Sequence, residues 1–379
     1  MAFFLPSFII SFKININSEL SERLVDHMER SRGLEHRMEY FDYLRILATF
    51  AVMMLHISAH NFYLADVRLW EWNVLNIYDS IVRWAVPVFV MMSGALFLGG
   101  TQSLEQILKK NVKRILTALL FWSVLYAVVV YFATGCGIKN AVAEVFIGHY
   151  HLWFLFMLTG LYLIVPFLRK IVESEQLMKY FLLLSFLFSF VLPQLLSIVS
   201  LYSEFAGSVI SRMLDNVNFH FALNYVYYFV CGYYLNQISL DQKRRRIIYI
   251  MGIAGFLATI VMTAGISIWK QEAQETFYGY FTINVMLEGI LIFVLAKQWF
   301  GKIAASEKQK RFVRKLSEYS FGAYLVHALV IEALNLFQIH SLAFTPVLAV
   351  PLISILVFVI SYLISCMLHH IPLLKKYIV

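Results

Sequence analysis

Charged residues are scarce in this sequence, and their scarcity excludes an ordinary soluble protein. Only 14% of the 379 residues are Asp, Glu, Lys or Arg, whereas 60% are hydrophobic. A soluble globular domain has about 25% charged and about 45–50% apolar residues. The mean hydropathy of +0.72 points the same way. The composition therefore predicts an integral membrane protein.

Cysteine is also scarce, and the motifs of several soluble enzyme classes are missing. Cys136, Cys231 and Cys366 lie far apart, so their spacing predicts neither a disulfide framework nor a metal site. The sequence has no Gly-x-Ser-x-Gly nucleophile elbow, no Gly-x4-Gly-Lys phosphate loop and no His followed four residues later by Asp. We expect no metal and no permanently bound cofactor.

Long apolar runs are what the sequence has in abundance. A membrane-spanning helix needs about 20 mostly apolar residues. Ten stretches meet this requirement: 43–62, 75–99, 115–134, 152–168, 180–199, 219–236, 247–268, 279–297, 319–338 and 345–368. No strand-type alternation or internal repeat is visible. The predicted fold class is all-α, a polytopic bundle of about ten transmembrane helices.

The basic residues predict how this bundle is oriented. If the N-terminus is cytoplasmic, nearly all Lys and Arg residues between the helices fall on the cytoplasmic side. The largest clusters are 109–114, 243–246 and 302–315. Both termini are therefore predicted to be cytoplasmic. The formal charge of +8 is attributed to loops beside anionic membrane lipid, and no nucleic-acid partner is expected.

Residues 1–37 are predicted to form a cytoplasmic arm outside the membrane domain, which covers 38–379. The apolar stretch "MAFFLPSFIISF" is short and follows no basic residue, which argues against a signal peptide. Met38 immediately precedes the first predicted membrane helix. Two alternatives stay open: a dispensable arm, or an artefact of the start codon with translation beginning at Met38.

The first predicted helix contains two residues that are costly inside a bilayer, Arg45 and His56. A helix turns about 100° and rises about 1.5 Å per residue, so both residues lie on one face, about 16 Å apart. Charged groups in a membrane usually face the protein interior or a water-filled cavity. We therefore predict a polar cavity along this face, with Arg45 at its cytoplasmic mouth. A snorkelling arginine and a structural histidine are the simpler alternatives.

Other polar residues fall at depths where water is scarce. Arg83 lies in the second predicted helix at a depth close to that of His56, and it needs a carboxylate, a carbonyl or a ligand there. Glu288 is a candidate partner, and a purely structural ion pair is the alternative. His327 lies near the middle of the ninth helix. Glu332 is five residues further on and on a different face, so these two are not a predicted dyad.

The start of the fourth predicted helix combines His149, His151 and Trp153 at the outer surface. Aromatic rings are common at membrane interfaces, and contact with a substrate is the other interpretation. The basic segment that ends at Arg114 lies on the predicted cytoplasmic side. It serves as a topology signal and is also a candidate binding site for phosphate groups.

Four segments, in this order, resemble acyltransferase family 3, a family of integral membrane proteins. The first, "FDYLRILATFAVMMLH", has ten residues between its arginine and its histidine. The others are "VPVFVMMSGALF", "HYHLWFLF" and "SEYSFGAYLVHALVI". The resemblance covers about residues 38–370 and is greatest to the branch that O-acetylates enterobacterial common antigen and similar surface glycans. Some other members of the family have an Arg-x-x-Arg pair at the place of Arg83, and this sequence does not.

This resemblance implies an O-acetyltransferase of the plasma (inner) membrane. Cytoplasmic acetyl-CoA would be the cosubstrate, and the acceptor would be a hydroxyl of a carbohydrate or lipid-linked glycan. It implies that His56 is catalytic, as a general base or a transient acyl carrier, and that Arg45 is needed for activity. Other expected site residues are Arg83 in catalysis, Arg45 and Arg114 at the CoA phosphates, and His151, Trp153, His327 and Glu288 at the substrate.

Two other classes of protein fit the same residues. A transporter of a glycan precursor or small anion also needs charged groups within the membrane. A structural protein of a glycan-assembly complex would tolerate replacement of Arg45 and His56. Transfer of an acetyl group by the purified protein distinguishes the enzyme from both.

Overall fold

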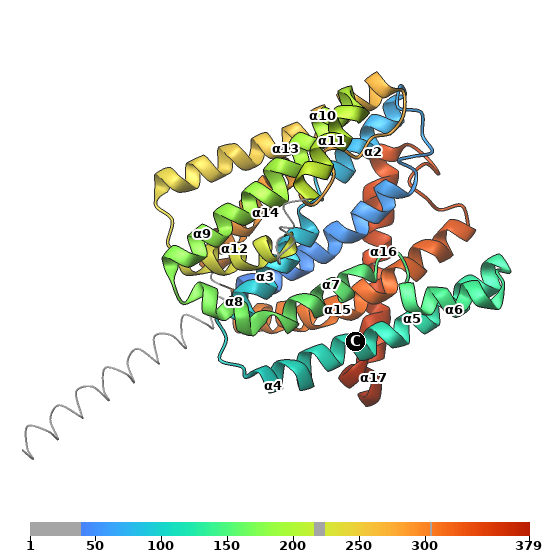
Figure 1. Cartoon of the computed structure of the whole chain (residues 1–379). Coiled ribbons are helices and arrows are strands. Elements are labelled where there is room, and N and C mark those ends of the chain that lie inside the picture. The colour runs from blue at the N-terminus through green and yellow to red at the C-terminus, as the bar shows by residue number, and fades with distance from the viewer. Residues whose placement is uncertain (1–38, 216–223, 304) are drawn as a thin grey trace, which may run out of the picture.

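The computed structural model describes residues 39–215, 224–303 and 305–379. Within these ranges the chain is helical and contains no strand, which confirms the predicted all-α class. Figure 1 shows long helices packed side by side in one bundle. The arm predicted for residues 1–37 lies outside the described residues, as does Met38.

In the described part of the chain, eight helices are long and apolar enough to cross a membrane. Four of them are single helices: the first helix (Glu39–His60), α13 (Gln242–Lys270), α15 (Glu307–Leu336) and α16 (Pro346–His369). Two combine two elements each: Trp70–Leu98 contains α2 (Trp70–Ser80) and α3 (Ala85–Leu98), and Ile283–Lys302 contains α14 (Ile283–Trp299) and η3 (Phe300–Lys302). Two combine three: Leu104–Thr134 contains α4 (Leu104–Gln106), η1 (Ile107–Val112) and α5 (Lys113–Thr134), and Glu175–Tyr202 contains α9 (Glu175–Phe186), η2 (Leu187–Val191) and α10 (Leu192–Tyr202).

A bent pair of helices provides a further apolar segment. α7 (Trp153–Leu163) and α8 (Val165–Val172) meet at an angle of 58°. Pro166 lies in the first turn of α8, and proline cannot continue a regular helix because it lacks an amide hydrogen and clashes with the preceding turn. The predicted stretch 152–168 is therefore a broken segment rather than one straight helix.

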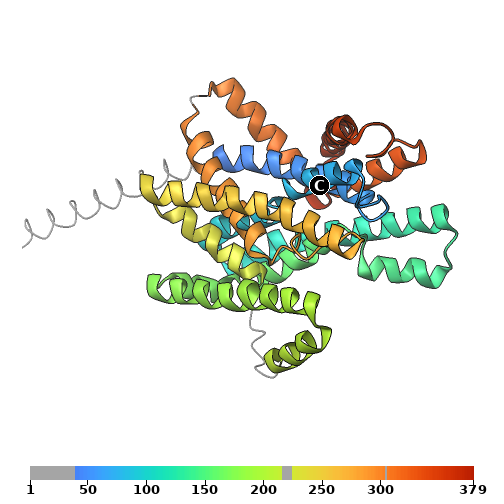
Figure 2. The same ribbon diagram turned by 90° about the horizontal axis from the view of Figure 1, so that it is seen from above.

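The predicted stretch 219–236 begins in residues outside the described ranges, and its described part is the short helix α12 (Tyr225–Gln237). Three short helices were not predicted: α6 (Ile138–Ile147), α11 (Glu204–Asp215) and α17 (Pro372–Tyr377). In Figure 2 the hairpin of α5 and α6 extends from one side of the bundle. The sequence thus predicts the long helices better than the short ones.

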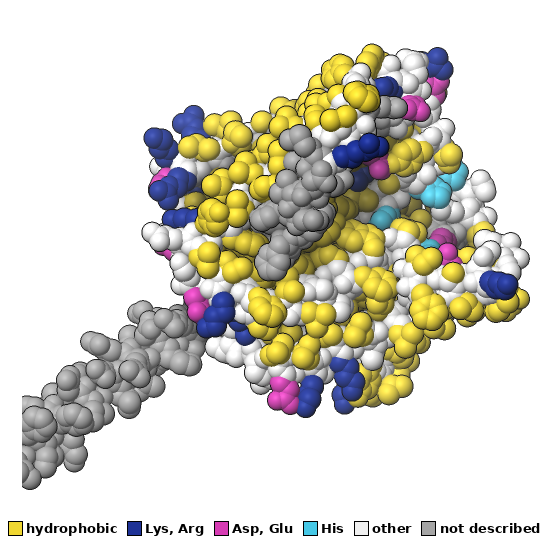
Figure 3. Space-filling model, viewed as in Figure 1, with side chains coloured by type: hydrophobic (Ala, Val, Ile, Leu, Met, Phe, Trp, Pro, Cys, Tyr) yellow, Lys and Arg dark blue, Asp and Glu magenta, His cyan; other side chains and the backbone are white. Residues whose placement is uncertain are grey.

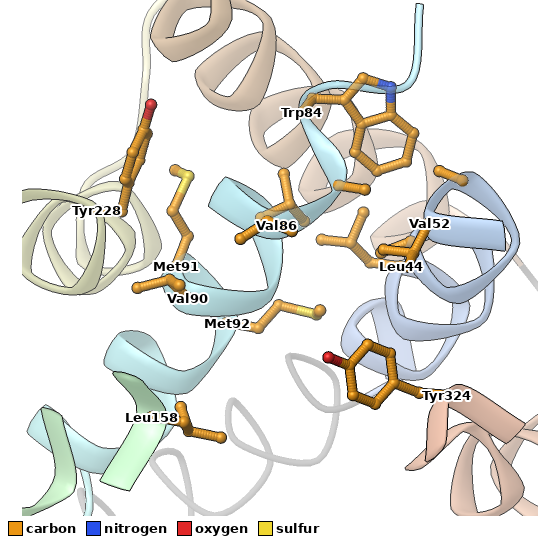
Figure 4. Packing of buried hydrophobic residues seen from close by; sticks show 14 of the residues in the cluster. Leu44, Val52, Trp84, Val86, Val90, Met91, Met92, Leu158, Tyr228 and Tyr324 are labelled. Carbon is orange, nitrogen blue, oxygen red and sulfur yellow. The ribbon is translucent and has the colours of Figure 1, made fainter. Parts of the chain in front are cut away.

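The first helix and α3 lie at the centre of the bundle, whereas α9 and α10 lie at its edge. Of the 18 most apolar consecutive residues in Trp70–Leu98, 78% are buried in the protein. The corresponding share for Glu175–Tyr202 is 17%. Figure 4 shows Leu44 and Val52 of the first helix on the side that faces Val86 of α3. The residues that the sequence singled out on the first helix therefore lie within the bundle.

Two glycines allow α3 and α12 to touch along their backbones. A Cβ atom on Gly94 would overlap the backbone of Phe229, and one on Gly232 would overlap the backbone of Met91. Small residues permit this close approach between helices in a membrane, where van der Waals packing replaces the hydrophobic effect as the main attraction.

Several helices begin or end at one end of the bundle. The start of the first helix and the connections after α8 and α12 lie at the same end of the bundle, at the left in Figure 1. At this end the Lys297 ammonium donates to the carbonyl oxygens of Leu235, Asn236 and Ile238 at 2.8–2.9 Å. A cation at the C-terminus of α12 is favourable because it satisfies unpaired carbonyls there.

Replacement of Gly94 or Gly232 by alanine should destabilise the bundle by about 1–3 kcal/mol or more, because the new methyl group meets backbone atoms that cannot turn aside. Thermal unfolding of the detergent-purified protein measures this. Gly265→Ala in α13 is the matched control, since no atom lies within 4 Å of its added Cβ. Equal unfolding temperatures for all three variants would contradict the close packing of α3 and α12.

Candidate functional site

Arg45 bonds to two polar side chains near the start of the first helix. Its Nη1 group donates to Asp42 Oδ1 at 3.1 Å and to Ser317 Oγ of α15 at 2.5 Å. The Ser317 hydroxyl in turn donates to Asp42 Oδ1 at 2.8 Å. Arg45 therefore faces α15, and these bonds join the two helices.

A pocket of about 440 Å³ lies beside Arg45, between the first helix and the first turns of α15. Its lining residues are Glu39, Asp42, Tyr43, Arg45, Lys310, Val313, Arg314, Ser317 and Glu318. Lys310 pairs with Glu39 at 2.8 Å, as Arg45 pairs with Asp42. An anion that binds in this pocket therefore has to replace carboxylates that are already in place.

His56 lies further along the first helix and is partly exposed. Its ring stacks on His327 of α15 at 5.2 Å between centroids and 28° between planes. The Tyr150 ring meets it edge-on at 5.1 Å. Within the described ranges no residue forms a hydrogen bond with the His56 ring. Its nitrogen atoms are therefore available to a substrate.

Two more imidazoles complete a cluster around His56. His151 lies 5.0 Å from His327 between ring centroids, and His149 Nδ1 lies 3.1 Å from His151 Nδ1. His151 is in the turn before α7, and burial lowers the pKa of its imidazole well below the usual value, so this ring is neutral at pH 7. Figure 3 shows histidine side chains beside acidic ones in a hollowed part of the surface.

These imidazoles are arranged for hydrogen bonding rather than for binding a metal. No group of three or more His, Cys, Asp or Glu side chains in the part of the chain that the structure describes could hold a metal ion. The His327 Nδ1 group bonds to the Tyr324 carbonyl oxygen, and the Tyr324 hydroxyl donates to the His151 carbonyl oxygen. His327 Nε2 is buried and has no partner among the described residues.

A polar stripe on α15 connects the surroundings of Arg45 with those of His56. Ser317, Ser320, Tyr324 and His327 are all buried, and their spacing of three, four and three residues places them on one helix face. Ser320 Oγ lies 2.8 Å from the hydroxyl of Tyr362 in α16. The sequence analysis missed this stripe, although its helical spacing within "SEYSFGAYLVH" was a visible signal.

The continuous polar cavity predicted between Arg45 and His56 is wrong for this conformation. Thr49 and Val52 lie on the same helix face between them and are only 1% and 4% exposed. The pocket beside Arg45 does not include His56. Side chains of the first helix pack against its neighbours in this interval, so the two polar regions are separate.

Arg83 lies in the turn between α2 and α3, and its partner is Asp79. Arg83 Nη2 donates to Asp79 Oδ2 at 2.6 Å, and both side chains are buried. The guanidinium also lies over the Tyr278 ring, 4.1 Å from its centroid. The sequence predicted that Arg83 needs a partner, but the carboxylate that pairs with it is Asp79 and not Glu288. Arg83 and Asp79 are one helical turn apart, a signal that the sequence contained.

Glu288 of α14 is completely buried and takes part in a different network. It accepts a hydrogen bond from the Thr259 hydroxyl of α13, and Asn284 Nδ2 donates to Thr259 Oγ1 at 2.8 Å. Its second carboxylate oxygen, Oε2, has no partner among the described residues. Glu288 therefore joins α13 to α14 and is not bonded to the imidazole cluster.

Arg114 and Trp153 lie outside the two polar regions. Arg114 Nη2 donates to the carbonyl oxygen of Val379 at 2.7 Å, and Arg114 does not line the pocket beside Arg45. The Trp153 ring packs against those of Tyr225 and Tyr280, with centroids 5.6 and 5.9 Å away. Of the residues predicted from sequence, the structure brings together His56, His151 and His327 and places Arg45 in a separate pocket lined by charged side chains of both signs.

A family model described as an acyltransferase domain matches residues 38–366. The chain belongs to this acyltransferase family. The match includes the first helix with Arg45 and His56, and also α15 with its polar stripe. No curated protein and no solved structure shows significant similarity to the chain. Together, the family and the apolar helices make this protein a multi-pass membrane acyltransferase.

Loss of Asp79 should strongly destabilise this acyltransferase. Asp79→Ala leaves the Arg83 guanidinium charged, buried and without its carboxylate, a situation that typically costs about 3–5 kcal/mol. Unfolding of the purified protein in detergent measures the change. Replacing both residues, as Asp79→Ala with Arg83→Met, should recover part of the loss because no charge remains buried.

The matched control is Asp66→Ala, which removes the partner of Arg68 in an exposed ion pair of 2.6 Å. Exposed pairs contribute little to stability because water solvates both partners when they separate. An Asp79→Ala variant as stable as the Asp66→Ala variant would show that the buried pair does not stabilise the fold.

Proposed function

We propose that the protein is a membrane O-acyltransferase that moves an acetyl group from cytoplasmic acetyl-CoA to a hydroxyl of a cell-surface carbohydrate. The observation that supports this proposal most is the arrangement of the first helix. One face of it carries Arg45 in a pocket with two arginines and a lysine and, about 16 Å further along, His56 in an imidazole cluster. The two ends of this face suit the two ends of an acyl-CoA molecule.

The pocket beside Arg45 is the proposed site for the CoA phosphates. Arg45 and Arg314 present guanidinium groups, which bind phosphate through two parallel hydrogen bonds. The charge pattern of the sequence predicts that this pocket lies on the cytoplasmic side, where the expected cosubstrate acetyl-CoA would bind. Phosphate would displace Asp42 and Glu39 from Arg45 and Lys310. Arg114 is no longer part of this proposed site because it bonds to Val379.

The pantetheine arm would pass between the first helix and α15. This interface offers hydroxyl groups of Thr49 and Ser320 that can bond to the amides of the arm. In the described conformation the route is closed at Thr49 and Val52, so entry of the donor requires the two helices to separate. Polar groups lining the route make this separation less costly than opening an apolar interface would be, because they can bond to the arm.

His56 is the proposed catalytic residue. As a general base it removes the proton of the acceptor hydroxyl while the oxygen attacks the thioester carbonyl carbon. The carbon–sulfur bond then breaks, and the CoA thiolate takes up the proton. Alternatively, His56 attacks the thioester itself and carries the acetyl group before transferring it to the hydroxyl. Either role requires a neutral imidazole with a free nitrogen.

Arg83 is the proposed stabiliser of the oxyanion that develops on the thioester carbonyl. Its guanidinium is held by Asp79 and Tyr278. A fixed donor of this kind is worth about 3 kcal/mol in the transition state. Its Nε group is buried without a partner among the described residues, which leaves a donor for the reaction.

The acceptor would enter from the outer side of the plasma (inner) membrane. Surface carbohydrates or lipid-linked glycans fit this direction, and acetylation of such glycans is the activity that the sequence resemblance implies. Aromatic rings commonly stack on sugar rings, and Trp153, two residues after His151 in the chain, packs against Tyr280 and supplies such rings. His151 and His327 border the same region.

Replacement of His56 by alanine should lower acetyl transfer by at least about a hundredfold, because general bases contribute about 10²–10⁴ to the rate. The measurement is transfer of radiolabelled acetyl from acetyl-CoA to isolated cell-envelope glycans, with equal amounts of purified protein. His60→Ala is the control, since His60 is exposed one turn further along the same helix. A carrier protein would transfer no label, and an active His56→Ala variant would exclude His56 as the base.

Replacement of Arg45 or Arg314 by alanine should raise KM for acetyl-CoA about tenfold or more, because each loses a charge-assisted bond to phosphate. KM for S-acetylpantetheine, which has no phosphate, should remain unchanged. Arg68→Ala serves as the control for general loss of positive charge. An equal rise in KM for both donors would contradict binding of phosphate at this pocket.

A further inference from the structure

His149 and Glu332 form an ion pair at the outer end of the imidazole cluster. His149 Nε2 lies 2.8 Å from Glu332 Oε1. The His149 side chain is 10% exposed and that of Glu332 is 37% exposed. The sequence analysis placed Glu332 and His327 on different helix faces. The structure shows that the partner of Glu332 is His149.

Hydrogen bonds determine which nitrogen of His151 carries its proton. His151 Nε2 lies 3.3 Å from the carbonyl oxygen of Leu325. A carbonyl oxygen can only accept, so Nε2 must carry hydrogen and donate. The ring is buried and neutral, so its other nitrogen, Nδ1, has only a lone pair. His151 Nδ1 therefore accepts a hydrogen bond, and the donor is His149 Nδ1 at 3.1 Å.

The same reasoning gives His149 a second proton. Its Nδ1 group donates to His151, and its Nε2 group faces the carboxylate of Glu332, which accepts. His149 with hydrogen on both nitrogens is an imidazolium cation. The Tyr126 ring lies parallel to it at 4.2 Å and 15°, and an aromatic face attracts a cation in this position.

We propose that Glu332 is a positioning residue that holds His149 as an imidazolium and through it fixes the ring of His151. The His151 ring contacts His327 edge-on, and His327 stacks on His56. Three imidazole rings, those of His149, His151 and His327, thereby connect Glu332 with the proposed catalytic His56. This inference extends the proposed function, because it assigns a residue that orients the acceptor side of the same site.

Loss of the proton between His149 Nδ1 and His151 Nδ1 would disturb the hydrogen bonds of the cluster. If His149 were neutral with hydrogen on Nε2, its Nδ1 lone pair would face the lone pair of His151 Nδ1. His151 would then have to move its proton to Nδ1 and give up its bond to Leu325. The titratable and aromatic groups facing His149 are Tyr126 from α5, Tyr150 and His151 from its own turn, His327 and Glu332 from α15, and His56 from the first helix.

Nuclear magnetic resonance of the ¹⁵N-histidine-labelled protein in lipid tests the protonation directly and needs no catalytic activity. We expect one doubly protonated ring at pH 7, assigned to His149 by its absence from His149→Gln. Glu332→Gln should lose this signal, and Glu272→Gln, an exposed glutamate on the same predicted side, should retain it. A singly protonated His149 in the unaltered protein would overturn the inference.

A conservative substitution tests the positioning role. Glu332→Gln should lower kcat for acetyl transfer, and Glu332→Asp, which keeps a carboxylate as acceptor for His149 Nε2, should recover part of the loss. KM for acetyl-CoA should change little. An equal drop in kcat for Glu332→Gln and Glu332→Asp would mean a merely structural role and would overturn the proposal. If the unaltered protein transfers no acetyl group, the proposed function fails while the resonance experiment still decides the ion pair.

Discussion

The contact between the first helix and α15 is the constraint on which the candidate site depends. Polar groups in an apolar bundle are costly unless they meet one another, and here Asp42 and Arg45 meet Ser317 while His56 meets His327. These pairings hold the two helices in register. They also place a pocket lined by charged side chains at one end of the interface and an imidazole cluster at the other.

The two ends of this interface are built for different chemistry. The pocket beside Arg45 contains charged side chains of both signs that are accessible to solvent and can exchange partners. The cluster around His56 contains imidazole rings packed against one another, and the His149–Glu332 pair lies at its rim. Packed side chains at Thr49 and Val52 separate them. Under the proposed function, such a closed interval would keep water away from the thioester until the donor itself separates the helices.

Other buried charges support the scaffold around this interface. The Arg83–Asp79 pair lies at the junction of α2 and α3, and Glu288 joins α13 to α14 through Thr259. The glycines of α3 and α12 bring those backbones into contact. These contacts hold the helices around the first helix and α15, whose interface carries the buried polar stripe of Ser317, Ser320, Tyr324 and His327.

The sequence by itself determined the all-α fold, the long helices, the face shared by Arg45 and His56, and the likeness to acyltransferase family 3, because length, hydropathy and helical period are local properties. Only the tertiary structure decided which polar residues meet. Asp79 rather than Glu288 pairs with Arg83, Glu332 pairs with His149, and Thr49 and Val52 close the predicted cavity. Partners on separate helices depend on how the helices rotate and pack, and the spacing of residues along one chain does not specify that.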